Sequence, residues 1–311
     1  MSEAVAPSGA QIEIHSSRLR AVVVEVGGGL RELTYDGHHL LDGYAADAMA
    51  DGGRGQPLLP WPNRLEDGQY EFDGHRLQLP IDNPAQHNAM HGLTRWRNWS
   101  SVDRADDRVR VEHLLYPEPG YPFTLELSIE YRLDASGLTV ETTATNRGTD
   151  RLPFGAGFHP YFTVGTQHVD QAELQLPARQ IVELDPHRML PTGKRVAVEG
   201  SQLDFRAPRL VGSTVMDNCF TDLQRGADGR ARVRVRNPDS GLEIAVWVAE
   251  PFRYIQAFTG ETLAPARRRQ GIAIEPMTCP PNAFHTGTDV IIIESGQARA
   301  MAWGVEIATR S

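Results

Sequence analysis

Two short segments place a titratable side chain among residues that hold the chain rigidly. His159 lies in "FGAGFHPYF" (154–162), immediately before Pro160, and Glu275 lies in "GIAIEPMTCPPNAF" (271–284), between an apolar run and Pro276. A carboxylate at the end of a buried strand costs free energy unless it is paired or protonated. A glutamate and a histidine fixed in this way are candidates for an acid–base pair. Either residue alone could equally be structural.

Two further stretches carry groups that suit a polyhydroxylated ligand. Asn63 and Arg64 follow the prolines of "PWPNR", and an arginine fork donates several hydrogen bonds to hydroxyls or to a carboxylate. A surface salt bridge is an equally good interpretation of that arginine. Trp96 and Trp99 lie in "QHNAMHGLTRWRNW" (86–99). An indole can stack on the apolar face of a sugar, although at least one of the two is expected in the core.

The same stretch contains His87 and His91, four positions apart, a spacing that on a helix could bind a metal. The flanking asparagines, Pro84 and Gly92 favour a loop, and no third ligand has a recognisable spacing. There is also no glycine-rich phosphate loop and no "GxSxG" nucleophile motif. The sequence therefore predicts no metal site and no cofactor.

Composition narrows the class of partner. The chain has 311 residues, 31 Lys plus Arg against 40 Asp plus Glu, and a net charge of -9. A mildly acidic chain repels nucleic-acid phosphates and anionic lipids, so we expect neither nucleic acid nor membrane as a partner. Two cysteines fit a reducing compartment, and the N-terminal residues lack the features of a signal peptide. We expect a cytoplasmic protein.

The elements that must position these residues are strands. Apolar and polar residues alternate over 123–133 and 138–146, with a turn between them, and again over 231–248 around "NPDSG". Residues 19–40 and 289–307 are further candidate strand pairs, and 43–69 are expected to form a long, functional loop. No sustained helical period is present. The pattern predicts an all-β fold, a large antiparallel β-sandwich that forms one domain over 1–311.

Five motifs together resemble one family. "NRLEDGQYEFDG", "NAMHGL", "GFHPYF", "MDNCF" and "EPMTCPPNAF" occur in the order typical of the aldose 1-epimerase (galactose mutarotase-like) family. The resemblance covers residues of about 20–305. It implies a β-sandwich of the galactose mutarotase-like (supersandwich) type, and an isomerase that interconverts the α and β anomers of free aldohexoses such as galactose or glucose without a cofactor.

The resemblance also implies roles for individual residues. Glu275 matches the general base that takes the proton of the anomeric hydroxyl, and His159 matches the general acid that protonates the ring oxygen. We therefore expect Glu275 to be ionised and His159 protonated in the reacting complex.

The substrate-binding residues follow from the same resemblance and from the residue types. His91 and Arg64 match groups that position the sugar, and Asp217 matches a carboxylate that binds its hydroxyls. Asn63 and Trp96 complete the predicted substrate-binding set.

The resemblance leaves other functions open. The well-known galactose mutarotases have His-Gly-Gly where this chain has "HGLTRW", which bears on substrate identity. Arg95 and Arg97 could meet a phosphate, so a hexose-6-phosphate 1-epimerase is one alternative. A noncatalytic sugar-binding or sensor protein of the same fold is another. We expect a monomer or a homodimer with a small sugar as substrate.

Overall fold

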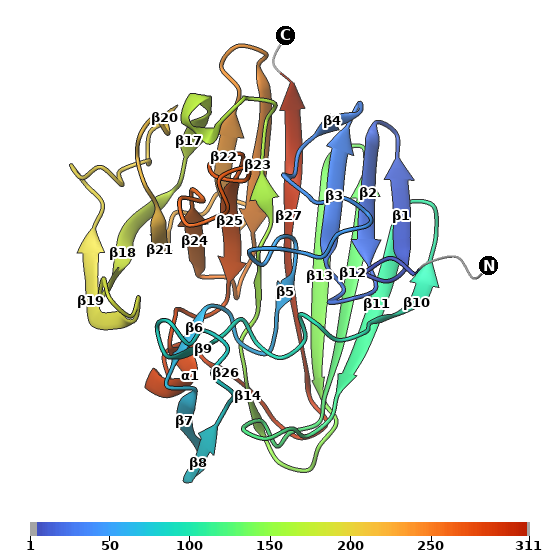
Figure 1. The fold of residues 1–311 in the computed structure, drawn as a ribbon, viewed down its shortest axis with the longest axis vertical. Coiled ribbons are helices and arrows are strands. Elements are labelled where there is room, and N and C mark those ends of the chain that lie inside the picture. Colours follow the sequence, from blue (N-terminus) through green and yellow to red (C-terminus); the bar gives the residue numbers. More distant parts are fainter. Residues whose placement is uncertain (1–4, 310–311) are drawn as a thin grey trace.

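The structure is a computed structural model that describes residues 5–309. Its strands form three large sheets of nine, eight and four strands, with three two-stranded ribbons beside them. In Figure 1 the nine-stranded sheet forms one layer, and the four-stranded and eight-stranded sheets lie across it. The all-β antiparallel sandwich predicted from the alternating pattern is confirmed.

The bounds of the elements follow, with each sheet in spatial order. The nine-stranded sheet contains β10 (Ser100–Arg104), β11 (Arg108–Leu115), β12 (Leu125–Asp134), β13 (Gly137–Asn146), β27 (Ala298–Thr309), β23 (Leu242–Val248), β22 (Ala231–Arg236), β17 (Glu173–Gln175) and β20 (Arg209–Leu210). The eight-stranded sheet contains β19 (Pro191–Ala197), β18 (Ala178–Leu184), β21 (Asp217–Leu223), β24 (Tyr254–Phe258), β25 (Ile272–Met277), β15 (Gly157–Phe158) and β5 (Pro57–Leu58), with β16 (Tyr161–Phe162) also paired to β25.

The remaining elements are shorter or lie outside these two sheets. The four-stranded sheet contains β1 (Gln11–Ser16), β2 (Leu19–Val24), β3 (Leu30–Tyr35) and β4 (His38–His39). The ribbons pair β14 (Leu152–Phe154) with β26 (Ile291–Ile293), β6 (Arg64–Glu66) with β9 (Asn88–Met90), and β7 (Gln69–Phe72) with β8 (His75–Gln78). The helical segments are η1 (Val169–Gln171) and the single-turn α1 (Ala283–Thr286).

The alternating segments form strands because one of their faces is buried. Along β12 every second residue is buried, from Leu125 to Leu133, and β12 pairs with β13 as the predicted hairpin. The turn between them is held by the Asp134 side chain, whose Oδ1 accepts the backbone N–H of Ser136 at 2.7 Å. The predicted hairpin of β22 and β23 also forms, around a turn in which Asn237 Oδ1 accepts the N–H of Asp239.

The predicted strand pair near the C-terminus is wrong as a pair. The segment 289–307 does contain two strands, but β26 pairs with β14, whereas β27 lies between β13 and β23 in the nine-stranded sheet. The alternation identified the strands. It could not identify their partners, because both edges of β27 present backbone groups to any strand of matching length.

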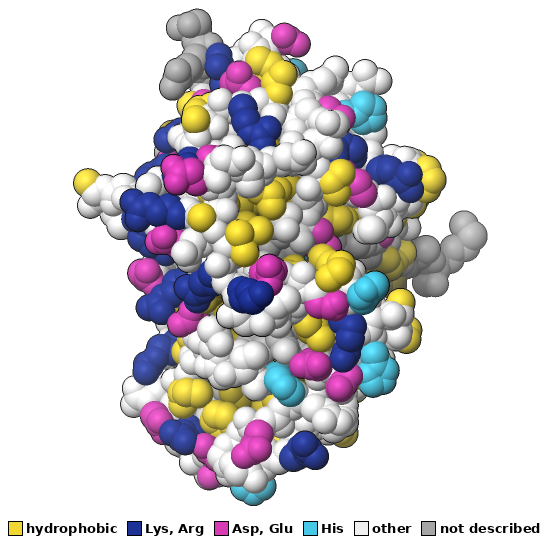
Figure 2. Space-filling view, turned by 90° about the vertical axis from the view of Figure 1, so that its left-hand side faces the viewer, with side chains coloured by type: hydrophobic (Ala, Val, Ile, Leu, Met, Phe, Trp, Pro, Cys, Tyr) yellow, Lys and Arg dark blue, Asp and Glu magenta, His cyan; other side chains and the backbone are white. Residues whose placement is uncertain are grey.

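The apolar residues of the sheets form one large core, which includes Tyr131, Trp303 and Phe158. On the outside, acidic and basic side chains are interspersed over the face seen in Figure 2. Within residues 5–309, no helix has the length and apolar character needed to cross a membrane.

The eight-stranded sheet positions Asp217, Glu275 and His159 of the candidate site. β25 lies between β24 and the short strands β15 and β16, so a side chain of β25 is flanked by both neighbours. The expected loop over 43–69 is interrupted by β5 and β6, which join it to this sheet and to β9. Figure 1 shows the ribbon of β6 and β9 beside the end of the eight-stranded sheet, so the two approach the same region.

Candidate active site

A pocket of about 390 Å³ opens where the eight-stranded sheet meets the loops that follow β4 and β8. Its lining contains all seven residues of the predicted site, which come from widely separated parts of the chain: Asn63, Arg64, His91, Trp96, His159, Asp217 and Glu275. The structure therefore brings the whole predicted set together. Tyr161, Phe258, Asp82 and Asn83 complete much of the rest of the wall.

Glu275 lies on β25, opposite Gln256 of β24, and its side chain is almost fully buried. Its Oε1 atom is 3.4 Å from Nε2 of His159, and its Oε2 atom has no hydrogen-bond partner among the described residues. Burial raises the pKa of Glu275 well above its ordinary value, and the nearby Asp217 carboxylate adds to the rise, whereas Arg64 opposes it. Glu275 lines the pocket, and an unpaired buried oxygen of a carboxylate in a pocket wall is a candidate for contact with a ligand.

His159 lies between β15 and β16, and its main chain is fixed on both sides. Its N–H donates to the carbonyl of Gln56 at 3.0 Å, and its carbonyl accepts the N–H of Gly55 at 2.9 Å. The ring stacks on Tyr161, with centroids 5.0 Å apart and planes 19° apart. Burial is the main cause that lowers the pKa of His159 to about 3.

The loop before β5 approaches the His159 ring so closely that it requires glycine. A Cβ atom on Gly53 would lie 2.7 Å from Cδ2 of His159, and the φ angle of Gly53 is +77°. Tyr161, which stacks on the His159 ring, is itself covered by Arg54, whose Cζ atom lies 4.5 Å from the centre of the tyrosine ring. Nη2 of Arg54 lies 2.8 Å from Oδ2 of Asp42. The histidine is thus held by a glycine on one side and by a tyrosine backed by an arginine.

Burial therefore opposes the charged form of each member of the pair in the ligand-free site. The favoured arrangement has a protonated Glu275 and a neutral His159, whereas the reacting complex was expected to have an ionised Glu275 and a protonated His159. The two arrangements contain the same number of protons. They differ by one proton transfer across the 3.4 Å contact between Oε1 and Nε2.

His91 is held as a neutral hydrogen-bond donor. Its Nδ1 atom accepts the backbone N–H of Asn63 at 3.2 Å, which leaves Nε2 to carry the proton. Burial lowers the pKa of His91 well below its ordinary value, and Arg95 adds to this effect. Its ring meets that of His159 edge-on, with centroids 5.5 Å apart. A neutral donor beside the acid–base pair suits a sugar oxygen.

Arg64 and Asp217 form the polar wall next to Glu275. The Arg64 Nη2 atom is 3.7 Å from Oδ2 of Asp217, and Arg64 Nη1 donates to Oδ1 of Asn63 at 3.2 Å. The other oxygen of Asp217 accepts the side-chain amide of Gln256 at 2.6 Å. These groups offer both donors and acceptors, the combination that a sugar hydroxyl needs.

The two tryptophans have different environments, one in the core and one in the pocket wall. Trp99 is buried in the core, whereas the Trp96 side chain lines the pocket with a relative exposure of 52%. The two nearby arginines also divide. Arg95 lines the pocket and pairs with Asp82 at 3.0 Å, whereas Arg97 is not part of its lining and pairs with Glu118 at 2.6 Å.

The histidines that were weighed as metal ligands have different surroundings. The His87 side chain is exposed and lies 2.7 Å from Asp67, while His91 is buried in the pocket. Over the part of the chain that the structure describes, no cluster of three or more His, Cys, Asp or Glu side chains is arranged to hold a metal ion.

Sequence reasoning missed several residues that support the site. Tyr161 was inside the quoted "GFHPYF" motif, two positions after His159, and its aromatic type was the available signal. Gln256 and Gln86, which bind Asp217 and Arg64 at 2.6 and 3.1 Å, carried no signal. Their contacts depend on strand pairing and loop conformation that a single sequence does not reveal.

Comparisons with known proteins identify the family and the fold. The model of the aldose 1-epimerase family matches residues 10–302. The uncharacterised Escherichia coli protein YihR is 34% identical over 299 residues, or 96% of this chain and 93% of that protein. An aldose 1-epimerase of Streptococcus thermophilus is 27% identical over 235 residues, or 68% of this chain and 67% of that enzyme.

A solved structure shows the same fold. An aldose epimerase homologue from C. elegans superimposes with a TM-score of 0.86 at 19% identity, covering 97% of this chain and 99% of that one. Together with the family match over almost the whole sequence, this shows that the chain belongs to the aldose 1-epimerase family.

Proposed function

We propose that this protein is an aldose 1-epimerase that interconverts the α and β anomers of a free aldohexose such as galactose or glucose. The observation that carries the proposal is the buried contact between Oε1 of Glu275 and Nε2 of His159, 3.4 Å apart, in the wall of a polar pocket that both residues line. A site that only binds sugar has no need of a buried acid–base pair. This distinction weighs against the noncatalytic alternative.

The reaction needs two proton transfers in each direction. The Glu275 carboxylate takes the proton of the anomeric hydroxyl, the electrons of that O–H bond form the carbonyl, and the bond between C1 and the ring oxygen breaks. His159 gives its proton to that ring oxygen. After rotation about the C1–C2 bond, the ring closes on the other face of the carbonyl with the two roles reversed. No net proton is gained or lost.

Ring opening leaves Glu275 protonated and His159 neutral, which is the arrangement that burial favours in the ligand-free site. The environment of the pair therefore stabilises the open-chain stage. Arg64 lowers the pKa of Glu275 and so favours the ionised form that begins the reaction.

A neutral hexose fits the pocket better than its 6-phosphate. Arg95 is already paired with the Asp82 carboxylate, and both line the pocket, so a phosphate would meet a neutralised arginine and a nearby negative charge. Arg97 is occupied by Glu118 outside the pocket. These pairings support the free sugar as substrate.

The test is a polarimetric screen of freshly dissolved α anomers over a panel of free and phosphorylated aldoses. We expect accelerated mutarotation of at least one free aldohexose, with a kcat/KM above that of its 6-phosphate. The phosphate alternative becomes the better account if the order is reversed. The noncatalytic alternative becomes the better account if sugars bind and none is converted faster than in buffer.

A further inference from the structure

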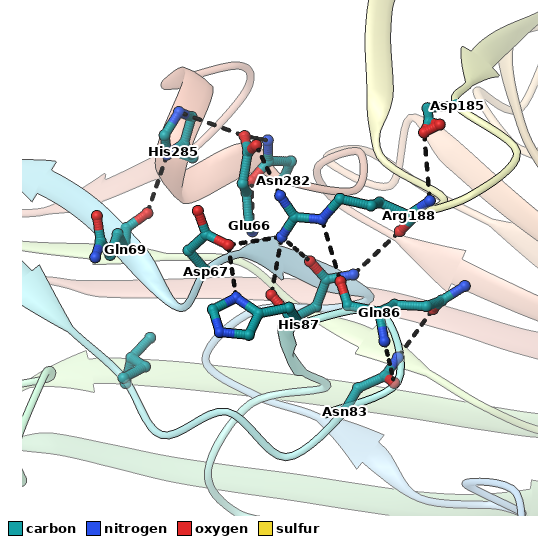
Figure 3. Close-up of polar contacts among 12 residues, drawn as sticks. Glu66, Asp67, Gln69, Asn83, Gln86, His87, Asp185, Arg188, Asn282 and His285 are labelled. Atoms are coloured by element: carbon teal, nitrogen blue, oxygen red, sulfur yellow. Dashed lines mark hydrogen bonds and ion pairs between the residues drawn. The ribbon is translucent and has the colours of Figure 1, made fainter.

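A single arginine on a distant hairpin holds the loop that closes one side of the pocket. Arg188 lies in the turn between β18 and β19, and Figure 3 shows its guanidinium between the loop that carries Gln86 and the turn that carries Asp67. Nε donates to the carbonyl of Gln86 at 3.2 Å, and Nη2 donates to the carbonyl of His87 at 2.9 Å.

The other side of the guanidinium is anchored to carboxylates. Nη2 also lies 2.7 Å from Oδ1 of Asp67, in the turn after β6, and Nη1 lies 3.3 Å from Oε1 of Glu66, the last residue of β6. Arg188 is one third exposed, and ion pairs at that exposure contribute little to stability. Its bonds to two successive backbone carbonyls instead fix the conformation of the pocket loop.

The side chain of Gln86 connects this loop to two residues of the pocket wall. Its Oε1 atom accepts Nε of Arg64 at 3.1 Å and the side-chain amide of Asn83 at 2.9 Å. Asn83 and Arg64 both line the pocket, whereas Gln86 and Arg188 are not among the lining residues. Arg188 thus binds the main chain of Gln86, and the side chain of Gln86 in turn binds Arg64 in the pocket wall.

The contacts with Gln86 and Asn63 fix the orientation of the Arg64 guanidinium. With Nε bound to Gln86 and Nη1 bound to Asn63, the guanidinium plane has a fixed orientation. Its Nη2 atom is then 3.7 Å from Asp217, too far for a strong hydrogen bond and open to a ligand oxygen between the two. A guanidinium that is fixed in advance binds hydroxyls without a further loss of side-chain entropy.

We propose that Arg188 and Gln86 are positioning residues that orient Arg64 toward the sugar hydroxyls. This inference rests on the proposed function, because it assigns Arg64 to substrate binding. Neither residue touches the substrate. Their loss should weaken sugar binding while the acid–base pair, which they do not contact, continues to work in the bound complex.

The kinetic test uses Gln86→Leu, which removes the acceptor at similar size, and Arg188→Met, which removes the donors. We expect KM to rise by about threefold to thirtyfold in each, with kcat changed much less. Gln86→Glu keeps an oxygen acceptor for Arg64 and should restore KM. The matched control is Arg151→Met, which removes an exposed arginine that pairs with Asp73 outside the pocket and should leave KM unchanged.

A second measurement keeps the inference separate from the proposed reaction. In ¹⁵N-edited NMR spectra, the Nε–H proton of Arg64 should exchange slowly with water in the wild type. It should exchange rapidly in Gln86→Leu and Arg188→Met, and slowly in Arg151→Met. Rapid exchange in the wild type overturns the inference whether or not any sugar is converted. If the wild type is active, an unchanged KM in Gln86→Leu also overturns it, whereas an inactive wild type counts against the proposed function alone.

Discussion

At the scale of single residues, the site is defined by groups placed where their charge is unfavourable. Glu275 and His159 are both buried, and each has a polar atom without a partner among the described residues, Oε2 of the glutamate and Nδ1 of the histidine. Buried polar atoms are usually satisfied, so unsatisfied ones mark a place where stability is sacrificed for another purpose. The most direct consequence concerns the stability of the protein itself.

We predict that Glu275→Gln stabilises the protein at neutral pH. Burial raises the folded-state pKa of Glu275 above its ordinary value of 4.5, so its contribution to stability is complete below pH 4.5 and is lost as the pH rises through the folded-state pKa. A glutamine has similar shape and does not titrate. Thermal unfolding should show a melting temperature at least about 2 °C above that of the wild type at pH 7, and a smaller difference at pH 4. An equal difference at both pH values would contradict a protonated Glu275.

The pH dependence of kcat/KM reports the same pair. One proton must be present on the pair, so activity falls when a second proton binds His159 or when the last proton leaves Glu275. Burial lowers the pKa of His159 to about 3, so the acidic limb of the pH–activity profile moves to lower pH. Burial raises the pKa of Glu275, so the basic limb moves to higher pH. We predict a broad plateau that includes pH 7, measured after subtraction of the uncatalysed rate. A maximum confined between the ordinary values of 4.5 and 6.5 would contradict the pKa directions.

At the scale of elements, alternation identified the strands and their turns, whereas their partners depend on long-range pairing. The hairpin of β12 and β13 was predictable because its turn and both buried faces are local. The position of β27 between β13 and β23 was not, since these strands are far apart in sequence. The same limit applies to the loop before β5, where the sequence shows glycines and the structure shows what they contact.

Gly53→Ala tests the contact between that loop and His159, the proposed general acid. The added Cβ atom would lie 2.7 Å from His159 Cδ2, so the ring must move away from its position beside Glu275. We predict a loss of kcat of about a hundredfold. The matched control is Gly74→Ala in the turn of β7 and β8, where φ is +78°, close to the +77° of Gly53, and a Cβ atom meets nothing within 4 Å. Both variants place an alanine at nearly the same positive φ, so equal losses of activity would show that the contact with His159 is unimportant.

At the scale of the whole molecule, the sequence motifs contain the residues that the structure gathers around one pocket, including the proposed acid–base pair. All seven predicted residues line one pocket, although they span from Asn63 to Glu275. What the sequence could not reveal are the supporting contacts, such as Arg188 on Gln86 or Arg54 on Tyr161. These join segments with no local signal of proximity, and they arise only when the sheets and their connecting loops are packed together.

The arrangement of the whole site also predicts indifference to metal removal. The proposed steps use only Glu275 and His159 as proton carriers, with Arg64, His91 and Asp217 as hydrogen-bonding groups. Dialysis against a strong chelator should leave the rate of mutarotation unchanged. A loss of activity that zinc or another divalent ion restores would show that a metal takes part.

The central claim is that the contact between Glu275 and His159 carries the reaction. The most direct measurement is the rate of exchange between the α and β anomers at equilibrium, followed by NMR exchange spectroscopy on galactose and glucose with wild-type protein, Glu275→Gln and His159→Asn. We predict rapid exchange with the wild type, and rates lower by about a hundredfold to ten-thousandfold with each folded variant. Exchange close to the wild-type rate in either variant would contradict the account for that residue.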